Sequence, residues 1–259
     1  MSEQSPASAT EVMVEARDLV KVFRTRRGEV RAVDGLSFDC HAGEIFGLLG
    51  PNGAGKTTTL RMLATILTPT SGSAILAGYD TRTDPGKVRE QIGFLATETG
   101  LYDRFTARET IRFFGRINRL DDAEIARRTD EIFSMLELTK LADRRVGTFS
   151  TGEKQKLSLA RSIIHDPPVL ILDEPTFGLD VMAARAVVES IKLFRQQGRT
   201  ILISTHIMRI AEKLCDRIGI LYSGKLRALG TLPNLKETYA AEDMEEVFFS
   251  VVGSPDNTK

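Results

Sequence analysis

The strongest constraint on the fold of this 259-residue chain is the glycine-rich stretch at residues 50–57. Its sequence, GPNGAGKT, fits the GxxxxGK[ST] pattern of a loop that wraps the phosphates of a nucleotide. The short apolar run before it is typical of a strand, and the apolar residues after it recur at helical spacing. A strand, a glycine turn and a helix start are the context that such a loop needs. The sequence therefore predicts a phosphate-binding loop (P-loop).

The residue types of this loop indicate its chemistry. Glycine accepts backbone angles that side chains forbid, so successive N–H groups can converge on an anion at a helix N-terminus. We expect Lys56 to reach the β- and γ-phosphates, Thr57 to be a Mg²⁺ ligand and Thr58 to be a further phosphate contact. The predicted binding residues of the loop are Gly50, Pro51, Asn52, Gly53, Ala54, Gly55, Lys56, Thr57 and Thr58.

Composition limits the classes of partner. The 35 Lys and Arg residues balance 35 Asp and Glu residues, so net charge gives no reason to expect a nucleic acid as partner. Cys40 and Cys215 are far apart and have no CxxC spacing, which favours two buried thiols in a reducing compartment over a metal site or a disulfide. No apolar segment approaches the roughly 18 residues of a spanning helix, and the polar N-terminus does not resemble a signal peptide. If the protein works at a membrane, we expect another chain to span it.

Strands that alternate with helices predict a parallel α/β sheet of the P-loop NTPase (RecA-like) class, with ligands at the carboxyl ends of its strands. Residues 12–23 and 31–40 alternate in a way that predicts paired strands of an N-terminal antiparallel β subdomain. Residues 97–165 are mostly helical in pattern and are inserted between strands, so we expect a separate helical subdomain. The predicted division is a disordered segment at residues 1–11, a main domain at 12–235 and a C-terminal helical tail at 236–259.

Several helix starts have capping signals. Thr106 with Glu109 predicts a capping box for a helix to about Arg119, and Asp121 is expected to open the next helix, to about Leu138. A second box, Ser150 with Glu153, heads a predicted helix at residues 154–164. The remaining predicted starts are Pro85 at the first helical position and Asp180 as an N-cap.

Reactive side chains follow the ends of several predicted strands. Asp173 comes after four apolar residues and is expected to hold Mg²⁺, usually through water, while Glu174 is expected to polarise the attacking water as general base. An Asp-Glu pair after a strand is ordinarily the start of a solvated turn, but in a chain that also has a P-loop the catalytic interpretation is favoured. His206 could contact the γ-phosphate and orient the base, although a lone histidine is more often structural. His41 and His165 are assigned structural roles.

Four segments together resemble the nucleotide-binding subunit of an ATP-binding-cassette (ABC) transporter. They are GPNGAGKTT, FSTGEKQKLSLARSII, VLILDEPTFGLD and the histidine of ILISTH, and the resemblance covers residues 12–235. It implies an ABC ATPase domain that hydrolyses ATP with Mg²⁺, and a head-to-tail dimer, homodimeric or pseudo-dimeric, that sandwiches two ATP molecules. It also implies a separate integral-membrane permease subunit and hence a peripheral location at the cytoplasmic face of the cell membrane.

Residues 149–153, FSTGE, match the family's signature sequence, which is usually LSGGQ. A serine and a glycine at a helix N-terminus make an anion site, and one subunit does not need two such sites on the same nucleotide. The resemblance implies that Ser150, Gly152 and Glu153 contact the ATP held by the opposite subunit.

The resemblance assigns two more residues. Phe23 would be the aromatic residue that stacks on adenine, although an aromatic residue at this place is by itself more typical of a core. Asp180 would be the acidic residue of the loop that crosses the dimer interface.

The chain departs from the family at two places. The family has a glutamine at about Thr97 that touches Mg²⁺ and relays to the membrane subunit, whereas this chain has Thr97 and then Glu98, which could be an alternative oxygen ligand for the metal. In the signature, Thr151 replaces a glycine and Glu153 a glutamine. Because Lys56 and the residues after the strands are present, we still expect hydrolysis.

The stretch GFLATETGLYDRFTARE with FSTGEKQK is similar to the sodium-extrusion branch of bacterial ABC ATPases, which is related to drug-export ATPases. The helical block at residues 97–165 is the expected docking surface for the permease. One alternative is a soluble ABC ATPase that acts on ribosomes or DNA, but the second cassette, long insertion or basic extension of that class is not found. A P-loop kinase or GTPase would not explain the FSTGE helix, and no NKxD motif follows.

Overall fold

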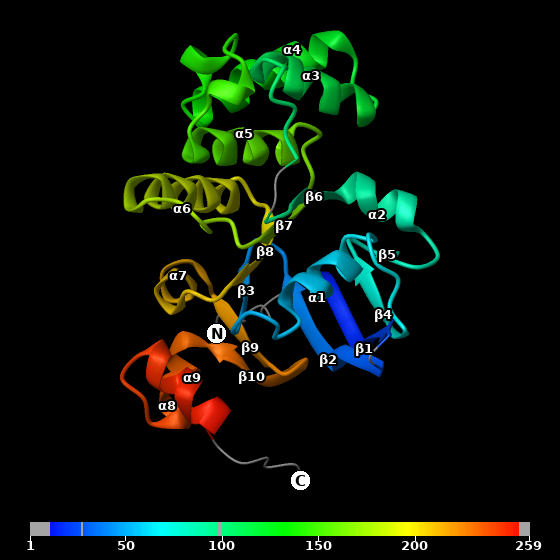
Figure 1. Ribbon diagram of the computed structural model, residues 1–259, viewed down its shortest axis with the longest axis vertical. Helices are drawn as coiled ribbons and strands as arrows, with labels where there is room; N and C mark the ends of the chain where they lie inside the picture. The colour runs from blue at the N-terminus through cyan, green and yellow to red at the C-terminus, as the bar shows by residue number, and fades with distance from the viewer. Residues whose placement is uncertain (1–10, 27, 98–99, 254–259) are drawn as a thin grey trace, which may run out of the picture.

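The computed structural model describes residues 11–26, 28–97 and 100–253, and Figure 1 shows its arrangement. An antiparallel sheet with the order β2-β1-β4-β5 lies at one side of the molecule. It is the N-terminal β subdomain expected from the alternating pattern. Its strands are β1 (Val12–Thr25), β2 (Gly28–His41), β4 (Ser71–Leu76) and β5 (Tyr79–Asp80).

The central sheet has six strands in the order β10-β9-β3-β8-β7-β6. Five of them are parallel, and β10 is an antiparallel edge strand paired with β9. Every residue of β3, β7 and β8 is buried, as their continuous apolar runs predict for strands covered on both faces. The bounds are β3 (Ile45–Leu49), β6 (Ile92–Leu95), β7 (Val169–Asp173), β8 (Thr200–Thr205), β9 (Arg217–Tyr222) and β10 (Lys225–Thr231).

The helices divide into groups around this sheet. The helical block α3–α5 lies at one end of the molecule, and α8 and α9 lie at the other end beside β9 and β10 (Figure 1). Two 3₁₀ turns, Thr139–Leu141 and Val146–Thr148, join α4 to α5. The helices are α1 (Lys56–Leu63), α2 (Pro85–Gln91), α3 (Ala107–Ile117), α4 (Asp122–Met135), α5 (Thr151–Ile163), α6 (Val181–Gln196), α7 (Met208–Leu214), α8 (Leu232–Tyr239) and α9 (Met244–Gly253).

The predicted helix starts agree with the structure, and two predicted ends do not. Both capping boxes form, and the side chains of Asp121 and Asp180 accept backbone N–H groups of the helices they precede. The helices α3 and α4 end two to three residues before Arg119 and Leu138, because Arg119 and Glu137 have left-handed φ angles of 64° and 59°. A left-handed residue just after the last turn is a common helix stop.

The predicted boundaries near the two ends of the chain can be compared with the described elements. Of the segment expected to be disordered, only Glu11 lies among the described residues. The predicted start of the tail at residue 236 falls inside α8, which begins at Leu232 after the cap residue Thr231. Val247 and Val251 of α9 pack in one cluster with Ile218 of β9, so this part of the tail belongs to a hydrophobic core.

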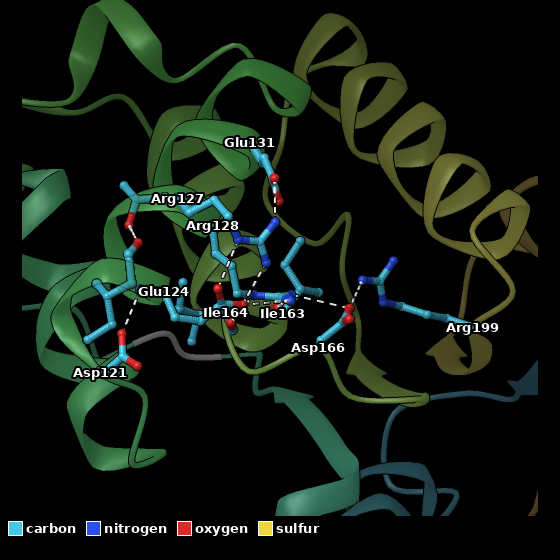
Figure 2. Close-up of polar contacts among 11 residues, drawn as sticks. Asp121, Glu124, Arg127, Arg128, Glu131, Ile163, Ile164, Asp166 and Arg199 are labelled. Atoms are coloured by element: carbon cyan, nitrogen blue, oxygen red, sulfur yellow. Dashed lines mark hydrogen bonds and ion pairs between the residues drawn. The ribbon is translucent and has the colours of Figure 1, made fainter.

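One charged cluster fixes α5 to its neighbours (Figure 2). Arg128 of α4 donates from Nε to the Ile164 carbonyl oxygen (2.5 Å) and from Nη2 to that of Ile163 (3.0 Å), at the C-terminal end of α5. Asp166 then pairs with both Arg128 (3.2 Å) and Arg199 (2.5 Å). The helical block is thereby tied to the segment that enters β7 and to the residue that precedes β8. Among the described residues, no helix has the length and apolar character to cross a membrane.

Candidate nucleotide site

The P-loop joins the end of β3 to the start of α1, and its glycines are required by the backbone. Gly53 and Gly55 have φ angles of 81° and 104°, in the left-handed region that favours glycine. A Cβ atom on Gly50 would lie 2.3 Å from the Leu221 carbonyl oxygen, and one on Gly55 would lie 2.5 Å from the Ala32 carbonyl oxygen. The first turn of α1 has no side-chain cap and no acidic residue. Its N–H groups are therefore left for an anion.

Lys56, the first residue of α1, places its ammonium group over this loop. Its Nζ donates to the carbonyl oxygens of Gly50 (2.7 Å) and Pro51 (3.2 Å) and lies 3.2 Å from Glu174 Oε1. Both side chains of this ion pair are buried. Among the described residues, Glu174 Oε1 has no hydrogen-bond partner, and Lys56 is the cation paired with this oxygen.

Glu174 occupies a strained position immediately after β7. Its φ angle is 49°, which is uncommon for glutamate and typical of residues held at functional sites. The backbone N–H of Glu174 donates to Ser204 Oγ (3.0 Å) and to the Ser204 carbonyl oxygen (3.2 Å), which hold this conformation. His206 Nδ1 lies 3.0 Å from Glu174 Oε2. The histidine is therefore placed to orient the carboxylate.

Three hydroxyl groups converge on the buried Asp173. Its Oδ1 accepts hydrogen bonds from Thr57 Oγ1 (3.1 Å) and Ser204 Oγ (2.6 Å), and its Oδ2 accepts one from Thr97 Oγ1 (3.0 Å). Sequence reasoning did not identify Ser204. The signal was available in the polar end of the otherwise apolar strand β8, whose register places Ser204 opposite Asp173.

These residues surround a pocket of about 340 Å³ at the carboxyl ends of the strands. The pocket brings together most of the predicted P-loop residues with the predicted base and histidine. Asp173 and Gly50 are not among the residues that line it. The lining consists of residues 51–58 with Ala32, Thr97, Glu174, Phe177 and His206.

The residues present fit a magnesium ion that is bound mainly by substrate phosphates. Among the described residues, no three His, Cys, Asp or Glu side chains converge as a metal cage. Mg²⁺ characteristically takes one or two protein oxygens and completes its shell with phosphates and water. The adjacent oxygens of Thr57 and Asp173 suit that role. The alternative ligand Glu98 lies outside the described residues, whereas Thr97 reaches the site.

The signature residues lie elsewhere, at the N-terminus of α5. Ser150, Gly152 and Glu153 line a separate pocket of about 270 Å³. Ser150 N–H donates to Glu153 Oε2 (2.7 Å), and Glu153 N–H donates to Ser150 Oγ (3.2 Å). A Cβ atom on Gly152 would lie 2.8 Å from that of Ala183, so glycine here also permits α5 and α6 to approach. The structure does not bring the signature to the P-loop of the same chain.

Two other predicted contacts are also outside the nucleotide pocket. Phe23 lies near the end of β1, 37% exposed, with Lys21 Nζ 5.3 Å from its ring centroid, and it is not among the lining residues. Asp180 caps α6 by accepting the N–H groups of Met182 and Ala183, both at 2.9 Å. The structure thus gives Asp180 a local role that is independent of any second chain.

The histidines and cysteines assigned structural roles do not reach this pocket. His41 Nε2 lies 3.2 Å from Asp39 Oδ2, and His165 Nε2 lies 3.0 Å from the Ile92 carbonyl oxygen. Cys40 and Cys215 are free thiols, and burial raises the pKa of both. The expectation of two unpaired thiols agrees with the structure.

The same sequence and fold occur in proteins of known family. The family model described as "ABC transporter" matches residues 33–177. The chain is 40% identical over 239 residues to the "ABC transporter ATP-binding protein NatA" of Bacillus subtilis (strain 168), covering 92% of this chain and 97% of that protein. The chain belongs to the ABC transporter family. This ABC ATPase is the ATP-binding and ATP-hydrolysing subunit of a transporter, as its motifs predicted.

Further relatives agree with this assignment. The ABC ATPase is 39% identical over 229 residues to "Nod factor export ATP-binding protein I" of Ralstonia nicotianae, covering 88% of this chain and 71% of that protein. A solved structure titled "Structure of ATP binding subunit of ABC transporter" superposes with a TM-score of 0.83 at 29% identity, covering 93% of this chain and 99% of the other. The predicted P-loop NTPase fold is confirmed. A kinase, a GTPase or a soluble ATPase without transport is not supported.

Proposed function

We propose that this ABC ATPase works as a head-to-tail dimer that drives export through a separate integral-membrane permease. The observation that supports the dimer is the separation of the two anion sites. The P-loop pocket contains the base and the lysine, whereas the signature lines another pocket at the start of α5. A signature that does not reach its own nucleotide can serve the nucleotide of a second copy.

Exposed apolar side chains between these two sites support such a dimer. Phe177 lines the nucleotide pocket, and Val181 and Met182 follow it at the start of α6. Their exposed fractions are 57%, 83% and 73%, respectively. Large apolar side chains gathered beside a site mark an interaction surface. In the dimer, the loop with Asp180 crosses this surface, and Ser150, Gly152 and Glu153 face the partner's ATP.

The hydrolytic step follows from the contacts of Lys56 and Glu174. When ATP occupies the loop, Lys56 turns from Glu174 to the β- and γ-phosphates, which leaves Glu174 Oε1 free. His206 holds the other carboxylate oxygen, so Oε1 faces the pocket and accepts the proton of the attacking water. A positioned base contributes about 10²–10⁴-fold in rate. A bound Mg²⁺, held by Thr57 and Asp173, would neutralise charge on the phosphate oxygens.

The adenine contact is proposed at Phe23. The strand β2 pairs with β1 and brings Ala32 into the pocket wall, so the β1–β2 hairpin flanks the nucleotide. Phe23 pairs with Val30 in that hairpin, two residues before Ala32. An exposed aromatic ring on this hairpin can stack on a purine.

The permease is expected to dock at a groove of about 660 Å³ between the β6 side of the core and α3. Ile66 and Ile117 both line this groove and are 56% and 57% exposed. Burial lowers the pKa of His165 in this lining, while Arg89, Glu90 and Arg119 supply its charged side chains. We therefore place the ABC ATPase at the cytoplasmic face of the cell membrane, as a peripheral subunit.

The solute is proposed to be exported rather than imported. Relatives named for Nod factor export and linearmycin resistance support export, and the GFLATETGLYDRFTARE stretch favours sodium ions over drugs. The test is to recover the Glu174→Gln variant with ATP from native membranes and to identify what accompanies it. We expect an integral-membrane protein that, in vesicles with the wild-type ATPase, exports ²²Na⁺ when ATP is present. Recovery with ribosomes and without a membrane protein would contradict the proposal.

A further inference from the structure

We propose that Thr97 and Ser204 are positioning residues that orient the carboxylate of Asp173 for Mg²⁺, an inference that rests on the proposed Mg²⁺-dependent hydrolysis. Asp173 is a buried carboxylate without a paired cation among the described residues. Its side chain is 1% exposed, and none of the ion pairs found among residues 11–26, 28–97 and 100–253 includes it. A buried carboxylate normally requires a cation nearby. Within the described part of the chain, the polar partners of this carboxylate are three hydroxyl groups, which leave its charge available to a metal ion.

The sheet places one hydroxyl on each side of this carboxylate. The strand β7 lies between β8 and β6, with Asp173 opposite Ser204 and Leu172 opposite Leu95. Ser204 therefore approaches from one neighbouring strand, and Thr97 approaches from the end of the other. They donate to different oxygens, Oδ1 and Oδ2 respectively. Two donors on opposite oxygens fix the rotation of a carboxylate, which a single donor does not.

The third hydroxyl has a different task. Thr57 also donates to Oδ1 in the structure, and it is the proposed metal ligand from the P-loop. A carboxylate has about four lone-pair positions, and the three hydroxyl groups occupy three of them. One position is therefore left for a metal-bound water, and a second becomes available if Thr57 turns away. When Thr57 turns to the metal, Ser204 and Thr97 remain and keep the carboxylate aimed at it. The two residues act through Asp173 and need not touch the metal.

The two positioning residues also differ in what else they contact. Ser204 is fully buried, and its Oγ accepts the N–H of Glu174 while it donates to Asp173. It therefore links the metal carboxylate to the base. Thr97 instead lines the nucleotide pocket, and its Oγ1 donates to Asp173 from that side. Thr97 is thus the positioning residue on the pocket side, whereas Ser204 is the one that also contacts the base.

The test compares Thr97→Val, which removes the hydroxyl at nearly constant size, with Thr97→Ser, which retains it. Mn²⁺ replaces Mg²⁺ as a probe, and its binding to the ATP complex of Glu174→Gln is followed by electron paramagnetic resonance, without need of turnover. We expect Thr97→Val to weaken Mn²⁺ binding about 10–100-fold, the usual effect of losing a partner of a metal ligand. Ser204→Ala should weaken it similarly. Thr97→Ser should bind Mn²⁺ with nearly the affinity of the Glu174→Gln parent. In all these variants, the affinity for ATP without metal should not change.

Thr129→Val is the matched control, since it deletes a buried hydroxyl that donates to the Ile125 carbonyl oxygen (2.6 Å) within α4. It should leave Mn²⁺ affinity unchanged. The inference is overturned if Thr97→Val binds Mn²⁺ as the parent does, if Thr97→Ser is as weak as Thr97→Val, or if Thr129→Val shows the same loss. Metal-independent hydrolysis by the wild type would instead overturn the proposed function, so the two failures are distinguishable.

Discussion

The N-termini of α1 and α5 are both suited to an anion, but the chain treats them in opposite ways. The α1 terminus begins after Gly55, with no side-chain cap and no acidic residue in its first turn. The α5 terminus is closed by a reciprocal capping box between Ser150 and Glu153, and Glu153 Oε1 also lies 3.7 Å from Arg144 Nη1. One terminus is open to a ligand, whereas the other is already satisfied by its own side chains.

In the proposed dimer, this difference would let one subunit hold ATP while a second subunit completes the site. An N-cap contact contributes about 1 kcal/mol, so an anion that binds at α5 must gain more free energy than the loss of the capping box costs. A triphosphate that is already held on the α1 terminus of another copy meets this condition more readily than a free anion does. The Arg128 contacts at the other end of α5 would hold the helix in place when such an anion binds at its N-terminus (Figure 2).

The largest expected effect is on chemistry at the α1 side. Glu174→Gln keeps the size of the side chain and removes its basicity, so turnover should fall about 10²–10⁴-fold while ATP binding and dimerisation remain. Phosphate release and analytical ultracentrifugation with ATP would measure both. Turnover at the wild-type rate would show that Glu174 is not the base.

Loss of the ammonium group at the α1 terminus should have the second-largest effect. Lys56→Ala removes a charge-assisted contact worth about 1.5–3 kcal/mol, so the Kd for ATP should rise about 10–150-fold by calorimetry. Lys154→Ala is the control, because it removes an amine from the start of α5 instead. Equal losses in the two variants would erase the contrast between the two termini.

A change at the α5 terminus should affect dimerisation more than ATP binding by the monomer. Ser150→Ala should leave ATP affinity of the monomer within about twofold and weaken ATP-driven dimerisation about tenfold, because only the dimer uses this hydroxyl on a phosphate. Loss of the cap should also lower the free energy of unfolding by about 0.5–2 kcal/mol. If monomer binding and dimerisation fell by the same factor, the site would not be shared between subunits.

The smallest expected effect distinguishes the cap from the shared site. Glu153→Gln retains an oxygen for the Ser150 N–H but removes a negative charge from the N-terminus of α5. The free energy of unfolding should therefore fall by about 0.3–1 kcal/mol. Dimerisation with ATP should tighten about two- to fivefold, since a carboxylate no longer faces the partner's phosphates. A looser dimer would mean that the carboxylate itself contributes to the interface.

The parts of this molecule that could be predicted are those encoded locally. The P-loop, both capping boxes and the Asp173-Glu174 strand end depend on neighbouring residues, and the structure places all of them as expected. The helix stops at Arg119 and Glu137 were missed because left-handed conformations at such residues leave no mark in the apolar pattern.

Contacts that depend on the order of strands could not be predicted. Thr97 and Ser204 meet at Asp173 because β6, β7 and β8 are neighbours in the sheet, although the chain separates them by many residues. The ion pair between Lys56 and Glu174 also depends on sheet order, because β3, which leads to Lys56, is separated from β7 only by β8. Sequence patterns identify which strands end in reactive residues, but the sheet order decides which of those residues touch.

In the proposed dimer, the open terminus of α1 in one copy and the capped terminus of α5 in another enclose the same ATP. A crystal structure of Glu174→Gln grown with ATP and Mg²⁺ would show whether they do. We expect two copies related head to tail, with Ser150 of each within hydrogen-bond distance of the γ-phosphate held on Lys56 of the other. ATP bound at Lys56 with Ser150 away from every neighbour's γ-phosphate would contradict it.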